Sequence, residues 1–501
     1  MDIKRAKEEI RHTIEAYLMK NSHGEYMIPS MRQRPVLLMG PPGIGKTQIM
    51  EQVARECGIA LVAYTITHHT RQSAIGLPFI SEKEYGGEKK QVTEYTMSEI
   101  VASIYDKMEE TGLREGILFI DEVNCVSETL APAMLQFLQY KTFGNHKIPD
   151  GWIITAAGNP PEYNKSVREF DIATLDRIKR IDVEADFNVW KEYAAKVNIH
   201  SAVLSYLTAR PQYFYQVETT VDGKIFATPR GWEDLSEFLE VYEKLELPFD
   251  REVVGQYIQH AKIAKDFAAY LELYRKYQSL YQIDEILSGN RSEALMEQAA
   301  RAPFDERLSV ISLILSKLNN EFRRIANREN ILELVFGRLK TYKESQEAEE
   351  QPFGYMEQLL EEYRLEYEGK KKAGLLTRDE QYEYRDAGEL LGRYAQAVRG
   401  KTENRKDEVF SRLADLFGKD REEYETLCRD GLGMLEYAFD FMEGTFGDSQ
   451  EMVIFITELN TSYYAVRFLE ENECERYFQY NKRLLFEDRE KDILTRLDRL
   501  S

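Results

Sequence analysis

The sequence predicts an α/β fold in its first part, with helices on both faces of a parallel sheet, followed by a mainly α-helical C-terminal region. Two observations lead to this prediction. Between residues 34 and 184, short apolar runs alternate with segments of helical periodicity, which is typical of a parallel sheet built from strand–helix units. Beyond residue 275, nearly every segment repeats its apolar residues at helical spacing, as in a helix bundle.

The sheet is predicted from four apolar runs, each bounded by glycine, proline or charged residues. They are Val36–Met39, Ile59–Ile66, Ile117–Ile120 and Trp152–Ala157. Glycine-containing turns between β-prone arms predict three hairpins in addition. These are Phe79–Tyr95, Lys141–Ile148 and Phe214–Phe226.

Helices are predicted from capping and periodicity. Thr96 and Glu99 have the spacing of a capping box and are expected to begin a helix. Between Leu308 and Ile325, apolar residues recur at alternating spacings of three and four, which indicates a helix packed on another helix. Glu344–Phe353 and Gly369–Gly374 are the candidate linkers.

Composition limits the classes of function. The 501 residues suffice for two to four domains, and the net charge of −21 makes nucleic acid or an anionic membrane an unexpected partner. The four cysteines are widely spaced and form no CxxC pair, which favours a reducing compartment. Leu308–Leu318, the most apolar helical run, is too short to span a bilayer. We expect a cytoplasmic protein without membrane insertion.

The segment GPPGIGKT matches the phosphate-binding pattern GxxxxGK[ST] and lies between a predicted strand and a predicted helix. Its glycines allow backbone N–H groups to turn toward phosphate, Lys46 would reach the β- and γ-phosphates, and the Thr47 hydroxyl would bind Mg²⁺. The predicted nucleotide-binding residues are Gly40, Pro41, Pro42, Gly43, Ile44, Gly45, Lys46, Thr47 and Gln48.

Two carboxylates follow the third apolar run. Asp121 is expected to bind Mg²⁺, and Glu122 to act as general base toward the attacking water. The fourth run leads to Asn159, whose amide could position that water against the γ-phosphate. The alternative for Asn159 is a simple Asn-Pro turn.

Taken in order, GPPGIGKT, LFIDE, AAGNPPEYNKS and ATLDRIKRID resemble the AAA+ ATPases, and within them the MoxR-type, helix-2-insert branch. The resemblance covers roughly residues 30–245. It implies a P-loop AAA+ αβα sandwich over residues 1–185, a helical lid with a small hairpin over 186–275, and a helical domain of unknown role over 276–501. It also implies ATP and Mg²⁺ as ligands and ATP hydrolysis as the activity.

The resemblance assigns two arginines. Arg177 matches the position from which such proteins extend an arginine finger into a neighbouring subunit, with Arg180 as an alternative because Ile178 replaces the usual phenylalanine. Arg230 matches the sensor-2 arginine of the lid, and Pro229 would fix it in a first helical turn. A finger acting in trans implies a homo-oligomer, for which the family suggests a hexamer.

The family further suggests chaperone-like remodelling of a protein partner, commonly one that carries a von Willebrand factor A domain. His68–Gln72 and the hairpin tip Phe143–His146 are the hypothesised contacts to that partner. The adjacent histidines lack a third ligand at metal spacing, so a zinc site is not expected there. The alternative functions are a nucleic-acid-directed NTPase, resembling a restriction subunit, and a slow nucleotide-dependent switch.

Overall fold

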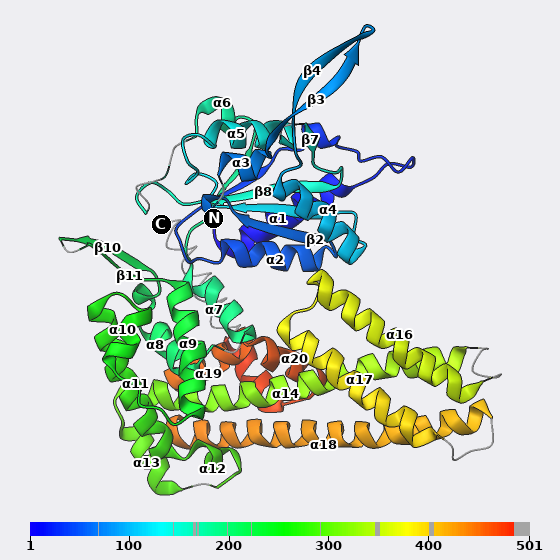
Figure 1. Cartoon of the computed structure of the whole chain (residues 1–501). Coiled ribbons are helices and arrows are strands. Elements are labelled where there is room, and N and C mark those ends of the chain that lie inside the picture. The colour runs from blue at the N-terminus through cyan, green and yellow to red at the C-terminus, as the bar shows by residue number, and fades with distance from the viewer. Residues whose placement is uncertain are drawn as a thin grey trace, which may run out of the picture. The chain divides into compact units, whose positions relative to one another are not determined.

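We describe the protein from a computed structural model (Figure 1). The structure describes residues 1–68, 70–143, 145–163, 167, 170–197, 199–221, 223–290, 292–345, 351–399 and 405–484. The chain forms two compact units. The first contains Met1–Val189 and Leu365–Gln381, and the second contains the remainder.

A five-stranded parallel sheet lies at the centre of the first unit. Its strands are β1 (Val36–Met39), β2 (Ala60–Thr65), β5 (Gly116–Asp121), β8 (Trp152–Gly158) and β9 (Lys179–Asp182), in the order β2-β5-β8-β1-β9. The four predicted runs are therefore confirmed as strands. β9 was not predicted, because only one of its four residues, Ile181, is buried and the others are charged.

Helices flank this sheet (Figure 1), so the predicted α/β class is confirmed. They are α1 (Ile3–Leu18), α2 (Lys46–Glu56), α3 (Arg71–Ile75), α4 (Glu99–Thr111), α5 (Ala131–Tyr140) and α6 (Ile172–Leu175), with 3₁₀ turns at Ser30–Arg32 and Ile66–His68. Apolar side chains of α4 and α5, including Ile104 and Phe137, pack with Leu118 and Ile154 of the sheet in one buried core. This packing holds the carboxyl ends of β5 and β8 in place.

The predicted capping box of α4 is wrong. The N-cap is Ser98, whose side chain accepts a hydrogen bond from the Val101 amide. The Thr96 hydroxyl accepts instead from the Leu77 amide at 2.9 Å. Thr96 therefore closes the base of the preceding hairpin, a competing use for a short hydroxyl side chain that local spacing does not reveal.

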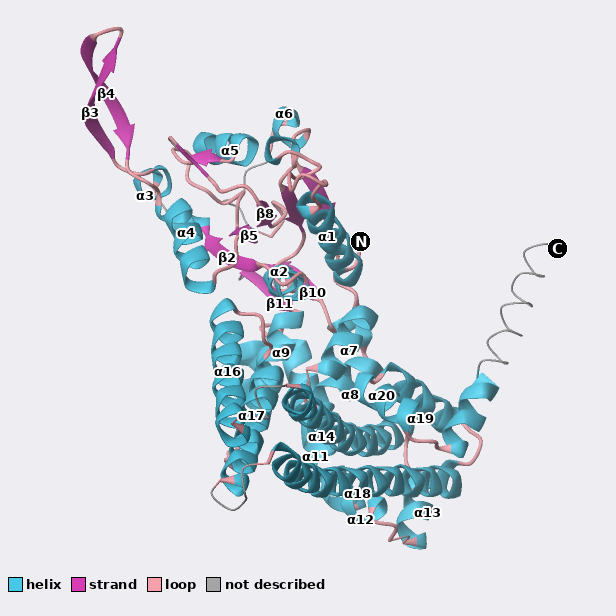
Figure 2. Cartoon of the chain, turned by 90° about the vertical axis from the view of Figure 1, so that its right-hand side faces the viewer, coloured by secondary structure: helices cyan, strands magenta, loops and turns pink. Residues whose placement is uncertain are grey.

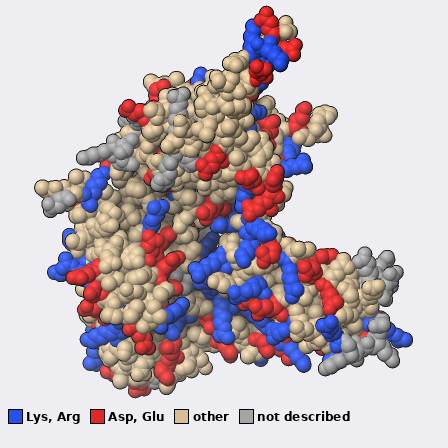
Figure 3. All heavy atoms as spheres, viewed as in Figure 1, with Lys and Arg blue, Asp and Glu red and all other residues tan. Residues whose placement is uncertain are grey.

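The first unit also contains two hairpins, which are separate from the five-stranded sheet. β3 (Pro78–Tyr85) and β4 (Glu88–Tyr95) form a long antiparallel pair that projects away from the sheet (Figure 2). Figure 3 shows both signs of charge near the tip of this hairpin. Lys89 and Glu82, one on each strand, form an ion pair. The short hairpin of β6 (Thr142–Phe143) and β7 (His146–Lys147) follows α5. Both hairpins were predicted, although Gly144 lies outside the described residues.

The remainder of the described chain is mainly helical, as predicted. Its helices are α7 (Phe187–Lys196), α8 (Ser201–Ala209), α9 (Pro229–Lys244), α10 (Arg251–Tyr257), α11 (Ala261–Tyr281), α12 (Ile283–Leu287), α13 (Glu293–Arg301), α14 (Phe304–Glu344), α16 (Pro352–Ala373), α17 (Arg378–Val398), α18 (Lys406–Phe446), α19 (Gln450–Thr461) and α20 (Tyr463–Glu471). A 3₁₀ turn at Pro211–Tyr213 precedes the hairpin of β10 (Gln216–Thr220) and β11 (Gly223–Ala227). Asp222, in the predicted turn of that hairpin, lies outside the described residues.

The periodic segment Leu308–Ile325 lies within α14, a single helix of 41 residues that packs along α18. The predicted linker Gly369–Gly374 is wrong over most of its length, because α16 continues to Ala373. A Glu366–Lys370 ion pair at 2.7 Å joins successive turns there, and the helix stops only at Gly374, whose φ is 72°. Residues 346–350 of the other predicted linker lie outside the described part of the chain.

Candidate functional site

The loop between β1 and α2 has the backbone that an anion-binding site requires. Gly43 and Gly45 have φ angles of 78° and 90°, a conformation that residues with a Cβ rarely adopt. Gly45 is the N-cap of α2, so the first N–H groups of that helix open toward the loop. A Cβ added to Gly40 would lie 2.6 Å from the Val183 carbonyl oxygen, so the loop can lie against the chain beyond β9 only with glycine there.

Lys46 begins α2 and is buried, with 8% of its surface exposed. Its Nζ donates to the carbonyl oxygens of Gly40 at 2.8 Å and Pro41 at 2.7 Å, and to Asn159 Oδ1 at 3.0 Å. The ammonium group is therefore held within the loop and next to the end of β8. Pro42 and Gln48 are exposed, whereas Ile44 packs inward.

Thr47 and Asp121 meet across the gap between α2 and the end of β5. Thr47 Oγ1 donates to Asp121 Oδ2 at 2.9 Å, and Asp121 Oδ1 accepts from the Glu122 amide at 2.9 Å. A hydroxyl and a carboxylate oxygen beside a phosphate-binding loop are ligands suited to Mg²⁺, which takes few protein ligands and completes its shell with water and phosphate. The residues present therefore fit a magnesium ion.

Glu122 has an unusual backbone. Its φ of 56° places a non-glycine residue in the left-handed region, a strained conformation that is concentrated at functional sites. Its Oε2 accepts a hydrogen bond from Thr67 Oγ1 at 3.2 Å, and Thr67 lies just beyond β2. Thr67 was not singled out from the sequence, because nothing local to it indicates a contact with a residue 55 positions away.

Asn159 follows β8, and its side chain reaches Lys46 as described above. The backbone carbonyl oxygen of Asn159 accepts a hydrogen bond from Asn124 Nδ2 at 2.8 Å. Asn124 is 2% exposed. A Cβ added to Gly158 would lie 2.7 Å from Asn124 Oδ1. Asn124 thus fixes the backbone that carries Asn159, a second contact that the sequence did not reveal.

The two candidate finger arginines differ in their partners. Arg177 follows α6, is exposed, and donates from Nη1 to Gln139 Oε1 at 2.7 Å. Arg180 in β9 makes an ion pair with Asp182, in which Nη2 and Oδ1 are 2.8 Å apart. Among the residues that the structure describes, Arg177 forms no such ion pair.

Arg230 belongs to the second unit, whereas the residues described above belong to the first. It is exposed in the first turn of α9, which begins at Pro229 as predicted. The N-cap Thr228 accepts from the Gly231 amide at 3.3 Å. Its role as a sensor stays a prediction.

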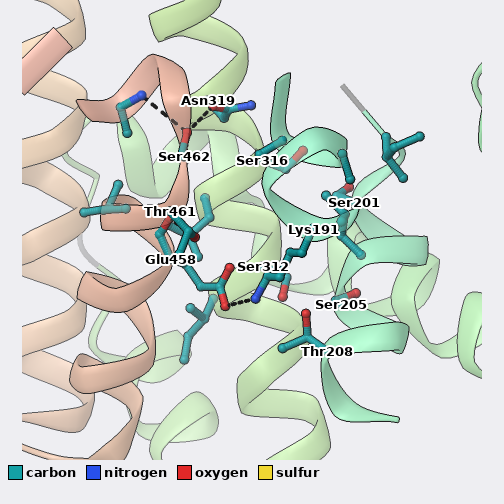
Figure 4. Close-up of a pocket in the computed structure, with 18 of the residues that line it drawn as sticks. Lys191, Ser201, Ser205, Thr208, Ser312, Ser316, Asn319, Glu458, Thr461 and Ser462 are labelled. Carbon is teal, nitrogen blue, oxygen red and sulfur yellow. Dashed lines mark hydrogen bonds and ion pairs between the residues drawn. The ribbon is translucent and has the colours of Figure 1, made fainter. Parts of the chain in front are cut away.

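The second unit contains a separate pocket between α7, α8, α14, α19 and α20 (Figure 4), with a volume of about 100 Å³ open to water. Its wall carries hydroxyl groups from α8 and α14, such as Ser201 and Ser316, and an ion pair between Lys191 and Glu458. In the described part of the chain, no group of three or more histidine, cysteine, aspartate or glutamate side chains could hold a metal ion. His69 of the predicted contact loop lies outside that part.

These features define the class of the first unit, a P-loop nucleotide-binding α/β domain. Residues 36–181 match the family model described as "ATPase family associated with various cellular activities (AAA)". The chain therefore carries an AAA ATPase-family domain, whose family implies nucleotide hydrolysis in general.

Two curated relatives and a solved structure are similar to part of this chain. "ATPase family gene 2 protein homolog B" is 30% identical over 143 residues in Mus musculus and 29% identical in Rattus norvegicus. Each match covers 27% of this chain and 16% of the relative. The solved structure of a RuvB mutant from Thermotoga maritima is 14% identical and covers 52% of this chain and 69% of its own, with a TM-score of 0.28. No helix in the described ranges combines the length and apolarity needed to cross a membrane.

Proposed function

We propose that the protein is a Mg²⁺-dependent ATPase of the MoxR type within the AAA+ class. The observation that carries this proposal is the meeting of Lys46, Thr47, Asp121, Glu122 and Asn159 at the carboxyl ends of β1, β5 and β8. A triphosphate, a metal ion and an attacking water each find a suitable group at this edge of the sheet.

Each side chain has a distinct task in this proposal. Lys46 would exchange its loop carbonyl partners for the β- and γ-phosphates. Thr47 and Asp121 would hold Mg²⁺, and the ion would supply positive charge against the phosphates. Glu122 accepts a proton from the attacking water. Because Asn159 Oδ1 contacts Lys46 Nζ at 3.0 Å, movement of Lys46 onto phosphate releases this amide to orient the water.

In this proposal, a neighbouring copy of the chain completes the site. Arg177 supplies the finger, since its cation has a neutral partner whereas Arg180 is ion-paired with Asp182. Arg230 acts as the lid sensor. The chain then works as a homo-oligomeric ring, for which we propose six copies, with residues 1–185, 186–275 and 276–501 as nucleotide-binding, lid and helical domains.

Hydrolysis in this ring drives chaperone-like remodelling of a cytoplasmic protein partner, for which a von Willebrand factor A domain protein is the candidate. The support is the resemblance of the motifs, together with the projecting β3–β4 hairpin, which exposes Ile80 at 70%. An isolated two-stranded hairpin is marginally stable in water, so a covering surface would stabilise it. The segments His68–Gln72 and Phe143–His146 are the other proposed contacts. Phe143 itself is 2% exposed and stacks on Phe137, so the described surface of the second segment comes from Asn145 and His146.

The test uses Glu122→Gln, which keeps the shape of the side chain and removes the base. We expect ATP binding to persist and phosphate release to fall about 10²- to 10⁴-fold. The variant should sediment as a ring with ATP and retain its partner in a pull-down. Glu109→Gln, on the exposed side of α4, is the matched control. A Glu122→Gln variant that hydrolyses ATP normally, or that stays monomeric with ATP, would refute the proposal.

A further inference from the structure

Gln139 contacts Arg177, the candidate finger. Gln139 lies in the last turn of α5, and its Oε1 accepts from Arg177 Nη1 at 2.7 Å. Hydrogen bonds to a charged donor are short and strong. An amide oxygen orients a guanidinium without neutralising it, whereas a carboxylate would cancel the charge that a finger must deliver.

The end of α5 is firmly joined to the short hairpin that follows. The rings of Phe137 in α5 and Phe143 in β6 stack with centroids 3.8 Å apart and planes 9° apart. The Ile148 amide donates to the Lys141 carbonyl at 3.0 Å and closes the hairpin. Phe137 and Phe143 are both 2% exposed or less, so the hairpin cannot tilt without moving the end of α5.

The short hairpin in turn contacts the long one. His146 Nε2 in β7 lies 3.0 Å from the carbonyl oxygen of Tyr95, the last residue of β4. This hydrogen bond connects the base of the projecting β3–β4 pair to β6–β7. A continuous set of contacts therefore runs from the projecting hairpin through His146, the Phe143–Phe137 stack and Gln139 to Arg177.

We propose that Gln139 is a positioning residue for Arg177, and that α5 couples the position of the two hairpins to this arginine. A load on the β3–β4 hairpin then changes how the finger is presented to the neighbouring copy. The inference rests on the proposed ring and on Arg177 acting in trans. It goes beyond them by naming the contacts that would link hairpin engagement to hydrolysis.

The first experiment uses mixed rings to test whether Arg177 acts in trans, separately from the role of Gln139. A Lys46→Ala subunit keeps its finger but has no working site, and an Arg177→Ala subunit keeps its site but has no finger. Mixing them should restore ATP turnover. If turnover is not restored, Arg177 does not act as a finger in trans. The inference about Gln139, which rests on that role, is then refuted with it.

Gln139→Met is then added to the Lys46→Ala subunit. It preserves the length of the side chain and removes the acceptor. We expect the restored kcat to fall about 10- to 100-fold, the range for a hydrogen bond to a charged group, with KM for ATP unchanged. Gln136→Met, on an exposed position of the same helix, is the control. Full restoration by the Gln139→Met subunit would overturn the positioning role.

The coupling is tested by adding His146→Ala to the same subunit, alone and together with Gln139→Met. If both residues act along one set of contacts, the double variant should lose little more activity than Gln139→Met alone. Lys147→Ala, on the neighbouring exposed position of β7, should leave turnover unchanged. Losses that simply multiply, or no effect of His146→Ala, would overturn the coupling.

Discussion

Lys141 offers a quantitative test of the junction between α5 and the short hairpin. It is 2% exposed, and its Nζ donates to Gln33 Oε1 at 3.1 Å. Burial, with repulsion from Lys147, lowers the pKa of Lys141 from 10.5 to about 8. At about 1.4 kcal/mol for each pH unit, the buried charge costs up to ~3 kcal/mol of stability near neutral pH.

We therefore expect Lys141→Met to stabilise the first unit at pH 7. Losing the hydrogen bond to Gln33 offsets about 1–2 kcal/mol of the gain, which leaves a net ~1–2 kcal/mol. The sign follows from the direction of the pKa. Between pH 8 and 10.5 the unfolded wild-type chain binds more protons than the folded one, so its stability rises with pH and the advantage of the variant shrinks.

Pulse proteolysis across a urea series, at pH 7 and at pH 9.5, measures the unfolded fraction of this unit. Lys89→Met, at an exposed position of β4, is the control. It removes only an exposed ion pair with Glu82, and such pairs contribute little, so stability should change little at either pH. The reasoning fails if Lys141→Met destabilises the unit at pH 7. It also fails if the difference between variant and wild type is the same at both pH values, because the buried charge would then not be its source.

Two further predictions concern the nucleotide site. Gly40→Ala should cost about 1–3 kcal/mol in stability and at least tenfold in nucleotide affinity by calorimetry, because its Cβ would meet the Val183 carbonyl at 2.6 Å. Gly255→Ala, where a Cβ meets nothing within 4 Å, should retain full affinity, and equal losses would contradict the clash. Thr67→Val should lower kcat about three- to tenfold by removing the hydrogen bond to Glu122, measured by phosphate release. Unchanged kcat would show that Thr67 does not orient this base.

The sheet could be predicted where burial controls the sequence. β5 and β8 lie inside the sheet with almost every residue buried, and such strands appear as continuous apolar runs. β9 is at the sheet edge, and its Lys179 and Arg180 carry no apolar signal. Its pairing with β1 depends on tertiary contacts, so no local pattern could reveal it.

The site could be predicted where its chemistry is local. The loop from Gly40 to Thr47 and the Asp121-Glu122 pair are each contiguous, so their residue types and order suffice. Thr67 and Gln139 are different, because they meet Glu122 and Arg177 across 55 and 38 residues. Ordinary threonine and glutamine residues carry no signal of such a meeting until the fold brings the partners together.

Near the end of α5, two cationic side chains, Arg177 and Lys141, contact amide oxygens, although carboxylates are plentiful in this chain. The sequence has 87 aspartate and glutamate residues against 66 lysine and arginine residues, and Arg180 and Lys89 both have carboxylate partners. Arg177 and Lys141 instead donate to Gln139 and Gln33. The buried Lys141 ammonium, paired with an amide oxygen and not with a carboxylate, lowers stability. Residues that lower stability in this way are concentrated at functional sites. Because Gln139 and Lys141 are two residues apart, one turn carries both the neutral acceptor for Arg177, the proposed finger, and the hydrogen bond that closes the short hairpin. The proposed coupling requires this proximity.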